Sequence, residues 1–112
     1  MIESLEKAID TYNRLAPDND RIRKSVEGKL RIVEIRLRDG NGYNFIMEGV
    51  TAHSLKEGRC NEKADIIVDS TSEILEGIMK GEVSPFKAMA RREIVIHAPI
   101  MDLLLMKKLF SA

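Results

Sequence analysis

The chain has 112 residues, 44% of them hydrophobic and 32% charged, and its 18 basic residues balance 18 acidic ones. A chain of this length predicts one domain over residues 1–112 with a single hydrophobic core, which excludes a separate catalytic module. The zero net charge excludes binding of nucleic acid through an excess of positive charge. Because Cys60 is the only cysteine, a disulfide framework and multi-cysteine metal sites are excluded as well.

The sequence favours a cytoplasmic protein. A single cysteine is typical of a reducing compartment. Residues 1–16 mix acidic and apolar side chains, unlike the basic and then apolar order of a signal peptide. The longest apolar runs, such as residues 103–106, are too short to span a bilayer.

Apolar periodicity predicts a helix over residues 2–16. Its apolar stripe recurs at steps of three and four residues through Ile2, Leu5, Ile9 and Tyr12. Pro17 disfavours helical geometry at the preceding residue and so ends the helix. The run 18–20 then offers capping oxygens for a second helical turn through Val26.

From Lys29 the apolar period changes to two, which predicts a strand as far as Arg38. Ile32 and Val33 are adjacent apolar residues, so the alternation slips and we expect a β-bulge there or a local excursion of the strand. The sequence Asp-Gly-Asn-Gly over residues 39–42 predicts a hairpin turn. Two further strands are expected, one with Tyr43, Phe45 and Met47 on one face and one over residues 50–55.

The second half of the chain predicts two more strands and three helices. A fourth strand is expected over residues 64–69, and the polar run 70–73 then resembles the start of a helix that Gly81 ends. Ser84 before Pro85 predicts the start of a short helix. A fifth strand over residues 94–97 and a strongly apolar last helix over residues 100–110 complete the pattern.

This order of elements predicts an α+β fold. We expect a five-stranded, mainly antiparallel sheet covered on one face by helices, and the order disfavours parallel winding.

Catalytic chemistry finds little support in the sequence. A nucleophilic enzyme would need Cys60 paired with His53 or His97, and no local motif joins them. Cys60 lies in a charged loop, and His97 lies among Ile and Val in a strand, where a structural histidine is the usual finding. The two histidines lack ligand spacing, so we expect no metal site and no cofactor.

A cluster of positive charge is the best candidate for contact with a charged partner. Between residues 21 and 38, seven basic residues stand against two acidic ones, Glu27 and Glu34. A solvated strand face explains this cluster most simply. Scarce aromatic residues argue against nucleic acid as the partner, and peripheral contact with an anionic membrane surface fits the cluster better.

The last third of the chain carries more apolar side chains than one sheet face needs. Several of these are methionines, which adapt to irregular cavities and to varied apolar ligands. Ordinary core packing is the simplest explanation of this excess.

Part of this region resembles the sterol carrier protein type 2 domain. The resemblance lies in residues 64–68, in 70–75, in the sequence Lys-Gly-Glu-Val-Ser-Pro over 80–85, in the Ala-Met pair 88–89 and in 93–96. The segment 33–45 resembles the first hairpin of that family. The chain also matches the family in length.

This resemblance implies a non-catalytic carrier with an apolar tunnel between sheet and helices, which binds a lipid-like molecule such as a fatty acyl, sterol-like or isoprenoid compound. Helical facing selects the residues expected to line it: Ile74, Ile78, Met79, Phe86, Met89, Leu104, Leu105 and Met106.

Two other hypotheses remain open. The same fold with a collapsed pocket would act as an interaction module, with the sheet or the last helix forming a homodimer interface. An enzyme that uses Cys60 or a histidine ranks below both.

Overall fold

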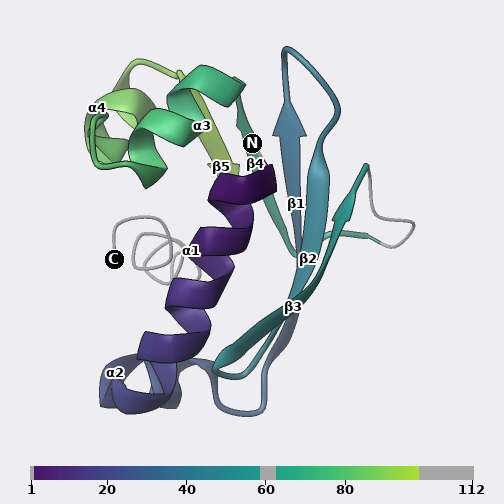
Figure 1. Ribbon diagram of the computed structural model, residues 1–112, viewed down its shortest axis with the longest axis vertical. Coiled ribbons are helices and arrows are strands. Elements are labelled where there is room, and N and C mark those ends of the chain that lie inside the picture. Colours follow the sequence, from purple (N-terminus) through teal and green to yellow (C-terminus); the bar gives the residue numbers. More distant parts are fainter. Residues whose placement is uncertain (1, 59–62, 99–112) are drawn as a thin grey trace.

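The computed structural model describes residues 2–58 and 63–98 of the chain (Figure 1). The elements in chain order are α1 (Ile2–Leu15), a 3-10 turn (Ala16–Asp18), α2 (Asp20–Val26), β1 (Leu30–Leu37), β2 (Tyr43–Glu48), β3 (Thr51–Glu57), β4 (Ile66–Ser70), α3 (Ser72–Met79), α4 (Pro85–Ala90) and β5 (Ile94–His97). The expected last helix over residues 100–110 and Cys60 lie outside the described residues.

The predicted first helix and its cap are confirmed. Helix α1 buries Leu5 and Tyr12, two residues of its apolar stripe, and the 3-10 turn follows it at Pro17. Asn19 caps α2, because its side-chain Oδ1 accepts a hydrogen bond of 3.1 Å from the backbone N–H of Ile22.

The side chain of Asn13 joins α1 to the edge strand β3. Its Nδ2 donates to the carbonyl of Ala52 at 2.8 Å, and its Oδ1 accepts from the backbone N–H of Ala52 at 2.6 Å. One helix residue thus satisfies both backbone groups of a strand residue that has no further strand beside it. Tyr12 adds a hydrogen bond of 3.1 Å to the carbonyl of Gly49, and burial raises the pKa of its phenol.

The five strands form one mixed sheet in the order β3-β2-β1-β4-β5. Three pairings are antiparallel, which confirms a mainly antiparallel sheet. The pairing of β1 with β4 is parallel, from Val33 opposite Ile66 to Leu37 opposite Ser70, so the expectation against parallel winding is wrong at the centre of the sheet. The physical reason is that β2 and β3 form a meander beyond one edge of β1, and β4 then returns to its other edge.

The expected bulge in β1 is also wrong. The pairing of β1 with β2 runs without interruption from Leu30 opposite Glu48 to Ile35 opposite Tyr43. Ile32 is simply a partly exposed apolar residue on the outer face of the sheet, whereas Val33 lies on the buried face. The register irregularity falls instead between β2 and β3, where Ser54 adopts a positive φ of 61°.

The core lies between one face of the sheet and the helices. Val33 and Ile35 of β1 and Phe45 of β2 are almost fully buried, and they belong to one core cluster with residues from each helix of the described part of the chain, including Leu5 of α1 and Leu75 of α3. Helix α1 crosses this face, and α3 and α4 cover the end of the sheet that carries β5 (Figure 1). Among the described residues, none of the helices is long and apolar enough to cross a membrane.

Candidate ligand-binding site

Local capping signals place α3 and α4 beside each other. Thr71 caps α3 with a hydrogen bond of 3.2 Å from the Ile74 N–H to its Oγ1, within the predicted run 70–73. Gly81, with a φ of 78°, follows the end of α3 as expected. Ser84 then caps α4, and Pro85 occupies its first position, so the two helix starts are confirmed.

The turn between these helices folds back tightly onto α3. The carbonyl of Gly77 accepts hydrogen bonds from the backbone N–H of Glu82 at 2.8 Å and of Val83 at 3.0 Å. A Cβ placed on Gly77 would meet the Val83 Cγ2 at 2.5 Å, so this close approach requires glycine.

An open hollow of about 710 Å³ lies between the end of α3, this turn and α4. The residues that line it are Ile78, Met79, Lys80, Gly81, Glu82, Val83, Ser84, Pro85, Lys87, Ala88, Arg91 and Glu93. Ile78 and Ala88 are buried, and Met79 and Val83 pack half-buried against the core. Lys80, Glu82, Lys87 and Arg91 are exposed, so the hollow has an apolar floor and a charged rim in which cations outnumber anions.

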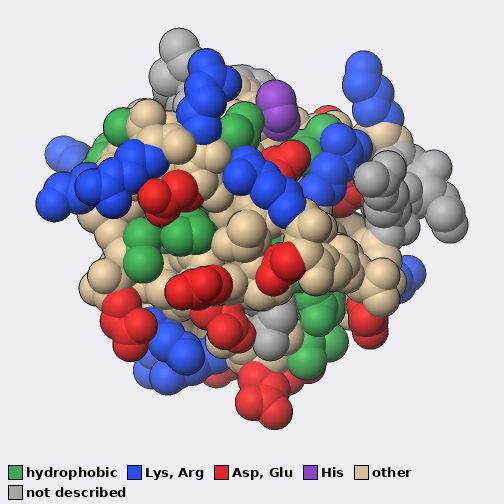
Figure 2. Space-filling view, turned by 90° about the horizontal axis from the view of Figure 1, so that it is seen from above, with side chains coloured by type: hydrophobic (Ala, Val, Ile, Leu, Met, Phe, Trp, Pro, Cys, Tyr) green, Lys and Arg blue, Asp and Glu red, His purple; other side chains and the backbone are tan. Residues whose placement is uncertain are grey.

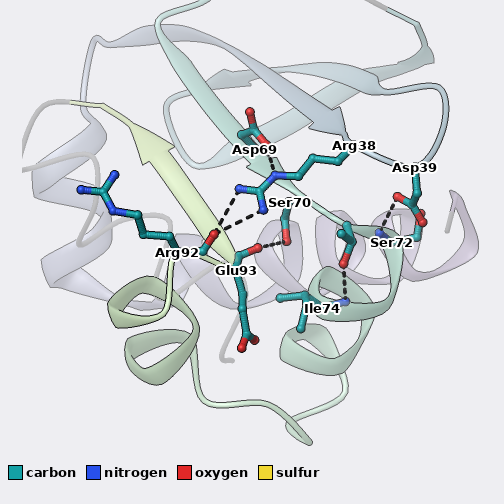
Figure 3. A network of polar contacts seen from close by, with 9 residues as sticks. Arg38, Asp39, Asp69, Ser70, Ser72, Ile74, Arg92 and Glu93 are labelled. Atoms are coloured by element: carbon teal, nitrogen blue, oxygen red, sulfur yellow. Dashed lines mark hydrogen bonds and ion pairs between the residues drawn. The ribbon is translucent and has the colours of Figure 1, made fainter.

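A polar network attaches the far side of the hollow to the sheet (Figure 3). The guanidinium of Arg38 pairs with Asp69 through Nε and Oδ1 at 2.7 Å and donates to the carbonyl of Arg92 at 3.3 Å. The hydroxyl of Ser70, fully buried, donates to the carbonyl of Glu93 at 2.8 Å. These contacts fix the turn between α4 and β5, in which Arg92 adopts a positive φ of 58°.

The opposite end of this network supports the start of α3. The backbone N–H of Ser72 donates to Asp39 Oδ1 at 3.0 Å, and its hydroxyl donates to the same oxygen at 3.3 Å. The hydrogen bond from the Ser72 backbone holds the pKa of Asp39 below its ordinary value. The hairpin turn at residues 39–42 is therefore linked to α3 as well as to β2.

The residues expected to line a ligand site occupy different surroundings. Ile78 and Met79 line the hollow, and Ile74 packs half-buried against the core. Phe86 and Met89 are 61% and 38% exposed on α4 and are not among the lining residues. Leu104, Leu105 and Met106 lie outside the described residues.

The sequence did not predict that the charged rim and the turn between α3 and α4 belong to the site. Lys87 and Arg91 lie one helical turn apart on α4, and Val83 enters the hollow because of its contact with Gly77. The available signal was the short spacing between Gly81 and Ser84, which forces two helices to meet at a tight turn.

The histidines carry no catalytic arrangement that the described residues reveal. His53 lies on the edge strand, with Nδ1 at 2.8 Å from the Ser54 hydroxyl and Nε2 at 3.0 Å from a Glu48 carboxylate oxygen. His97 is exposed at the end of β5. Over residues 2–58 and 63–98, His, Cys, Asp and Glu side chains form no group suited to a metal ion.

The predicted basic cluster does not form one surface. Arg21, Arg23 and Lys24 project from α2, at one end of the molecule. Arg36 and Arg38 lie at the other end of β1 and pair with Glu34 and Asp69. An eight-residue strand is about 25 Å long, so it separates the two groups.

A scan of the sequence against models of known protein families finds no match, and neither does a search of curated protein sequences. Solved structures do match. The UbiJ-SCP2 ubiquinone synthesis protein superposes with a TM-score of 0.70 at 12% identity, over 97% of this chain and 91% of that one. Sterol carrier protein 2 of Aedes aegypti, in complex with palmitate, superposes with a TM-score of 0.63 at 16% identity, over 96% and 94% of the two chains. The fold is that of sterol carrier protein 2.

The sterol carrier protein 2 fold also occurs within a larger enzyme. The inverting sec-alkylsulfatase Pisa1 from Pseudomonas sp. matches 91% of this chain with a TM-score of 0.63 at 16% identity. This chain spans only 16% of the length of that sulfatase. The likeness therefore identifies a shared domain fold, and the resemblance seen in residues 64–96 is confirmed at that level.

Proposed function

We propose that this chain is a non-catalytic carrier that binds a lipid-like molecule in the hollow between α3 and α4. The observation that carries the proposal is the composition of the hollow, in which apolar side chains form the floor, and three cations and Glu82 form the rim. The palmitate complex of the Aedes aegypti protein, which shares the fold, supports the same class of ligand.

The size of the hollow suits such a ligand. Sites for small molecules measure about 300–1,000 Å³, and the hollow measures about 710 Å³. Each methylene moved from water onto an apolar floor contributes about 0.8 kcal/mol, so a tail of ten carbons supplies roughly 8 kcal/mol before the costs of ordering are subtracted.

The rim suits a ligand with an anionic head. Lys87 and Arg91 lie four residues apart on α4 and face the same hollow, with Lys80 on the α3 side. Glu82 and Glu93 also line the hollow, so the cations exceed the anions by only one. We expect the head group to affect orientation and the apolar tail to supply most of the affinity.

The predicted lining residues differ in where they lie relative to the hollow. Ile78 and Met79 contact the tail in the hollow, with Ile74 beside them in the core. Phe86, Met89, Leu104, Leu105 and Met106 stay predicted ligand contacts that binding measurements have to test.

Titration of the delipidated full chain with palmitate tests the proposal. Met79→Trp fills part of the hollow with an apolar side chain, and we expect it to weaken palmitate binding about tenfold or more. Leu30→Trp is the matched control, because Leu30 is 58% exposed on β1 and does not line the hollow. Equal affinities in the wild type and both variants, or no uptake of palmitate, sterol or quinone by the wild type, would overturn the proposal.

A further inference from the structure

Helix α4 turns an apolar face toward solvent. Phe86 is 61% exposed and Met89 is 38% exposed, and a spacing of three residues places them side by side on the helix. Ala90 is exposed beside them, whereas Ala88 on the opposite side is 1% exposed and belongs to the core. The helix is therefore anchored by one small residue and presents its large apolar residues outward.

Positive charge flanks this apolar face. Lys87, Arg91 and Arg92 are exposed, and acidic residues stand only at the two ends of this segment, Glu82 before it and Glu93 after it, where the Glu93 carboxylate lies 4.0 Å from the Arg91 guanidinium. On a helical projection, Lys87 and Arg91 both lie along one edge of the stripe formed by Phe86, Met89 and Ala90. Figure 2 looks onto the end of the molecule that carries α3 and α4, and basic side chains project there on the side of α4, with acidic side chains among them.

The rest of the fold holds this face in a fixed orientation. The N–H of Glu93 donates to the carbonyl of Ala88 at 2.9 Å, which closes the end of α4. Arg38 reaches from β1 to the carbonyl of Arg92. Both contacts involve the C-terminal end of α4 and the residues that follow it, so they do not use the side chains of Phe86 and Met89.

The other large exposed apolar residues differ from this arrangement. Ile2, Leu15 and Leu30 are also exposed, and they stand at the ends of α1 and at the start of β1. Single exposed apolar residues are ordinary on soluble proteins, whereas an apolar pair with flanking cations matches the pattern of helices that lie on lipid surfaces.

We propose that α4 docks on the surface of a bilayer that contains anionic phospholipid. Phe86 and Met89 would enter the boundary between head groups and acyl chains, and Lys87, Arg91 and Arg92 would contact the anionic head groups. This inference goes beyond the binding of a soluble ligand, and the two are tested separately. Since Lys87, Ala88 and Arg91 also line the hollow, docking would bring the hollow to the lipid surface.

Vesicle flotation of the delipidated full chain tests this docking. We expect the protein to float with vesicles of phosphatidylcholine and phosphatidylglycerol, to float poorly with phosphatidylcholine alone, and to be released by salt, which screens the attraction. Each cation near an anionic surface contributes about fivefold to binding, so Lys87→Gln combined with Arg91→Gln should weaken it roughly tenfold or more. Phe86→Gln combined with Met89→Gln should weaken it by a similar factor.

Matched controls lie at the opposite end of the long axis, where α2 and the start of β1 are found (Figure 1). Lys24→Gln with Lys29→Gln removes the same charge, and Leu15→Gln with Leu30→Gln removes two exposed apolar side chains. We expect both controls to float as the wild type does.

Three results would overturn the docking proposal. The wild type could fail to float with the anionic vesicles, the α4 variants could float as the wild type does, or the controls could lose as much binding as the α4 variants. Retention on polyglutamate without binding to vesicles would assign α4 to an acidic protein partner and would also contradict it. Palmitate affinity is measured without vesicles, so failure of one proposal leaves the other in place.

Discussion

Two ends of the core use similar apolar residues in opposite ways. Where α1 covers the sheet, Leu5, Ile35 and Phe45 are no more than 1% exposed, and Asn13 satisfies both backbone groups of Ala52. Around α4, a hollow of about 710 Å³ stays open and Phe86 is 61% exposed. The first region contributes stability, whereas the second leaves large apolar side chains partly exposed.

This difference follows from the lengths of the helices. Helix α1 has 14 residues and buries Leu5 and Tyr12, with Ile9 partly buried between them, whereas α4 has six residues and buries only Ala88. A helix of six residues cannot be stable through its own hydrogen bonds and relies on its caps and on its contact with the sheet. Its remaining apolar residues are therefore not needed by the core.

The largest effect on stability is expected when a buried phenylalanine, and not an exposed one, is replaced by alanine. Phe45→Ala should lower the free energy of unfolding by about 3–5 kcal/mol, because it leaves a cavity in the core. Phe86→Ala should change it by less than about 1 kcal/mol, because that side chain is exposed. Urea unfolding of the two variants provides the measurement, and equal losses would show that α4 is part of the stabilising core.

A smaller loss is expected at the contact between α1 and β3. Asn13→Ala leaves the N–H and carbonyl of Ala52 without their partner in a buried place, and should lower the free energy of unfolding by about 2 kcal/mol. Asn41→Ala, in the exposed hairpin turn, is the matched control and should cost less than about 0.5 kcal/mol. If Asn13→Ala lowers the free energy of unfolding no more than Asn41→Ala does, this contact does not stabilise the fold.

The close approach of Val83 to Gly77 allows the packing beside the hollow to be tested. Gly77→Ala forces Val83 away from α3 and should cost about 1–2 kcal/mol, since a helical alanine is otherwise the better residue. Combined with Val83→Ala, which removes the obstructing Cγ2 atom, the loss should be smaller than the sum of the two single losses. Thermal or urea unfolding of the three variants measures this coupling, and strict additivity would contradict the proposed clash.

The smallest effect concerns pH. The pKa of Asp39 is lowered in the folded state, chiefly by the Ser72 N–H, so its ionised form stabilises the fold above its ordinary pKa, and this contribution is lost as the pH falls through the lowered value. Asp39→Asn should therefore reduce the loss of stability that the wild type shows below about pH 4. Urea midpoints at neutral and acidic pH measure the difference, and parallel curves for the two proteins would refute this role.

The sequence predicted what depends on neighbouring residues. The capping oxygens of Asn19 and Ser84, the stop at Gly81 and the hairpin turn at residues 39–42 are local signals, and the structure contains each of them. Alternation also predicted that Phe45 and Met47 share one face of the strand, and both are buried in the structure.

What depends on distant residues was missed. The parallel pairing of β1 with β4 joins segments about thirty residues apart, and no local pattern reveals on which edge β4 returns. The adjacent pair Ile32 and Val33 resembled a bulge only because an apolar residue on the outer face cannot be distinguished by sequence from a core residue. In the same way, the spacing of Phe86 and Met89 is that of residues on the buried side of a helix, and only the structure shows that they are exposed.

Native mass spectrometry of the purified full chain, followed by organic extraction, tests most directly whether the open end binds a lipid-like molecule. We expect a stoichiometric mass adduct that extraction identifies as an apolar compound, and Met79→Trp should lose it while Leu30→Trp retains it. An empty monomer that takes up no palmitate, sterol or quinone after delipidation would contradict the account, and an empty dimer would favour an interaction module built on the same fold.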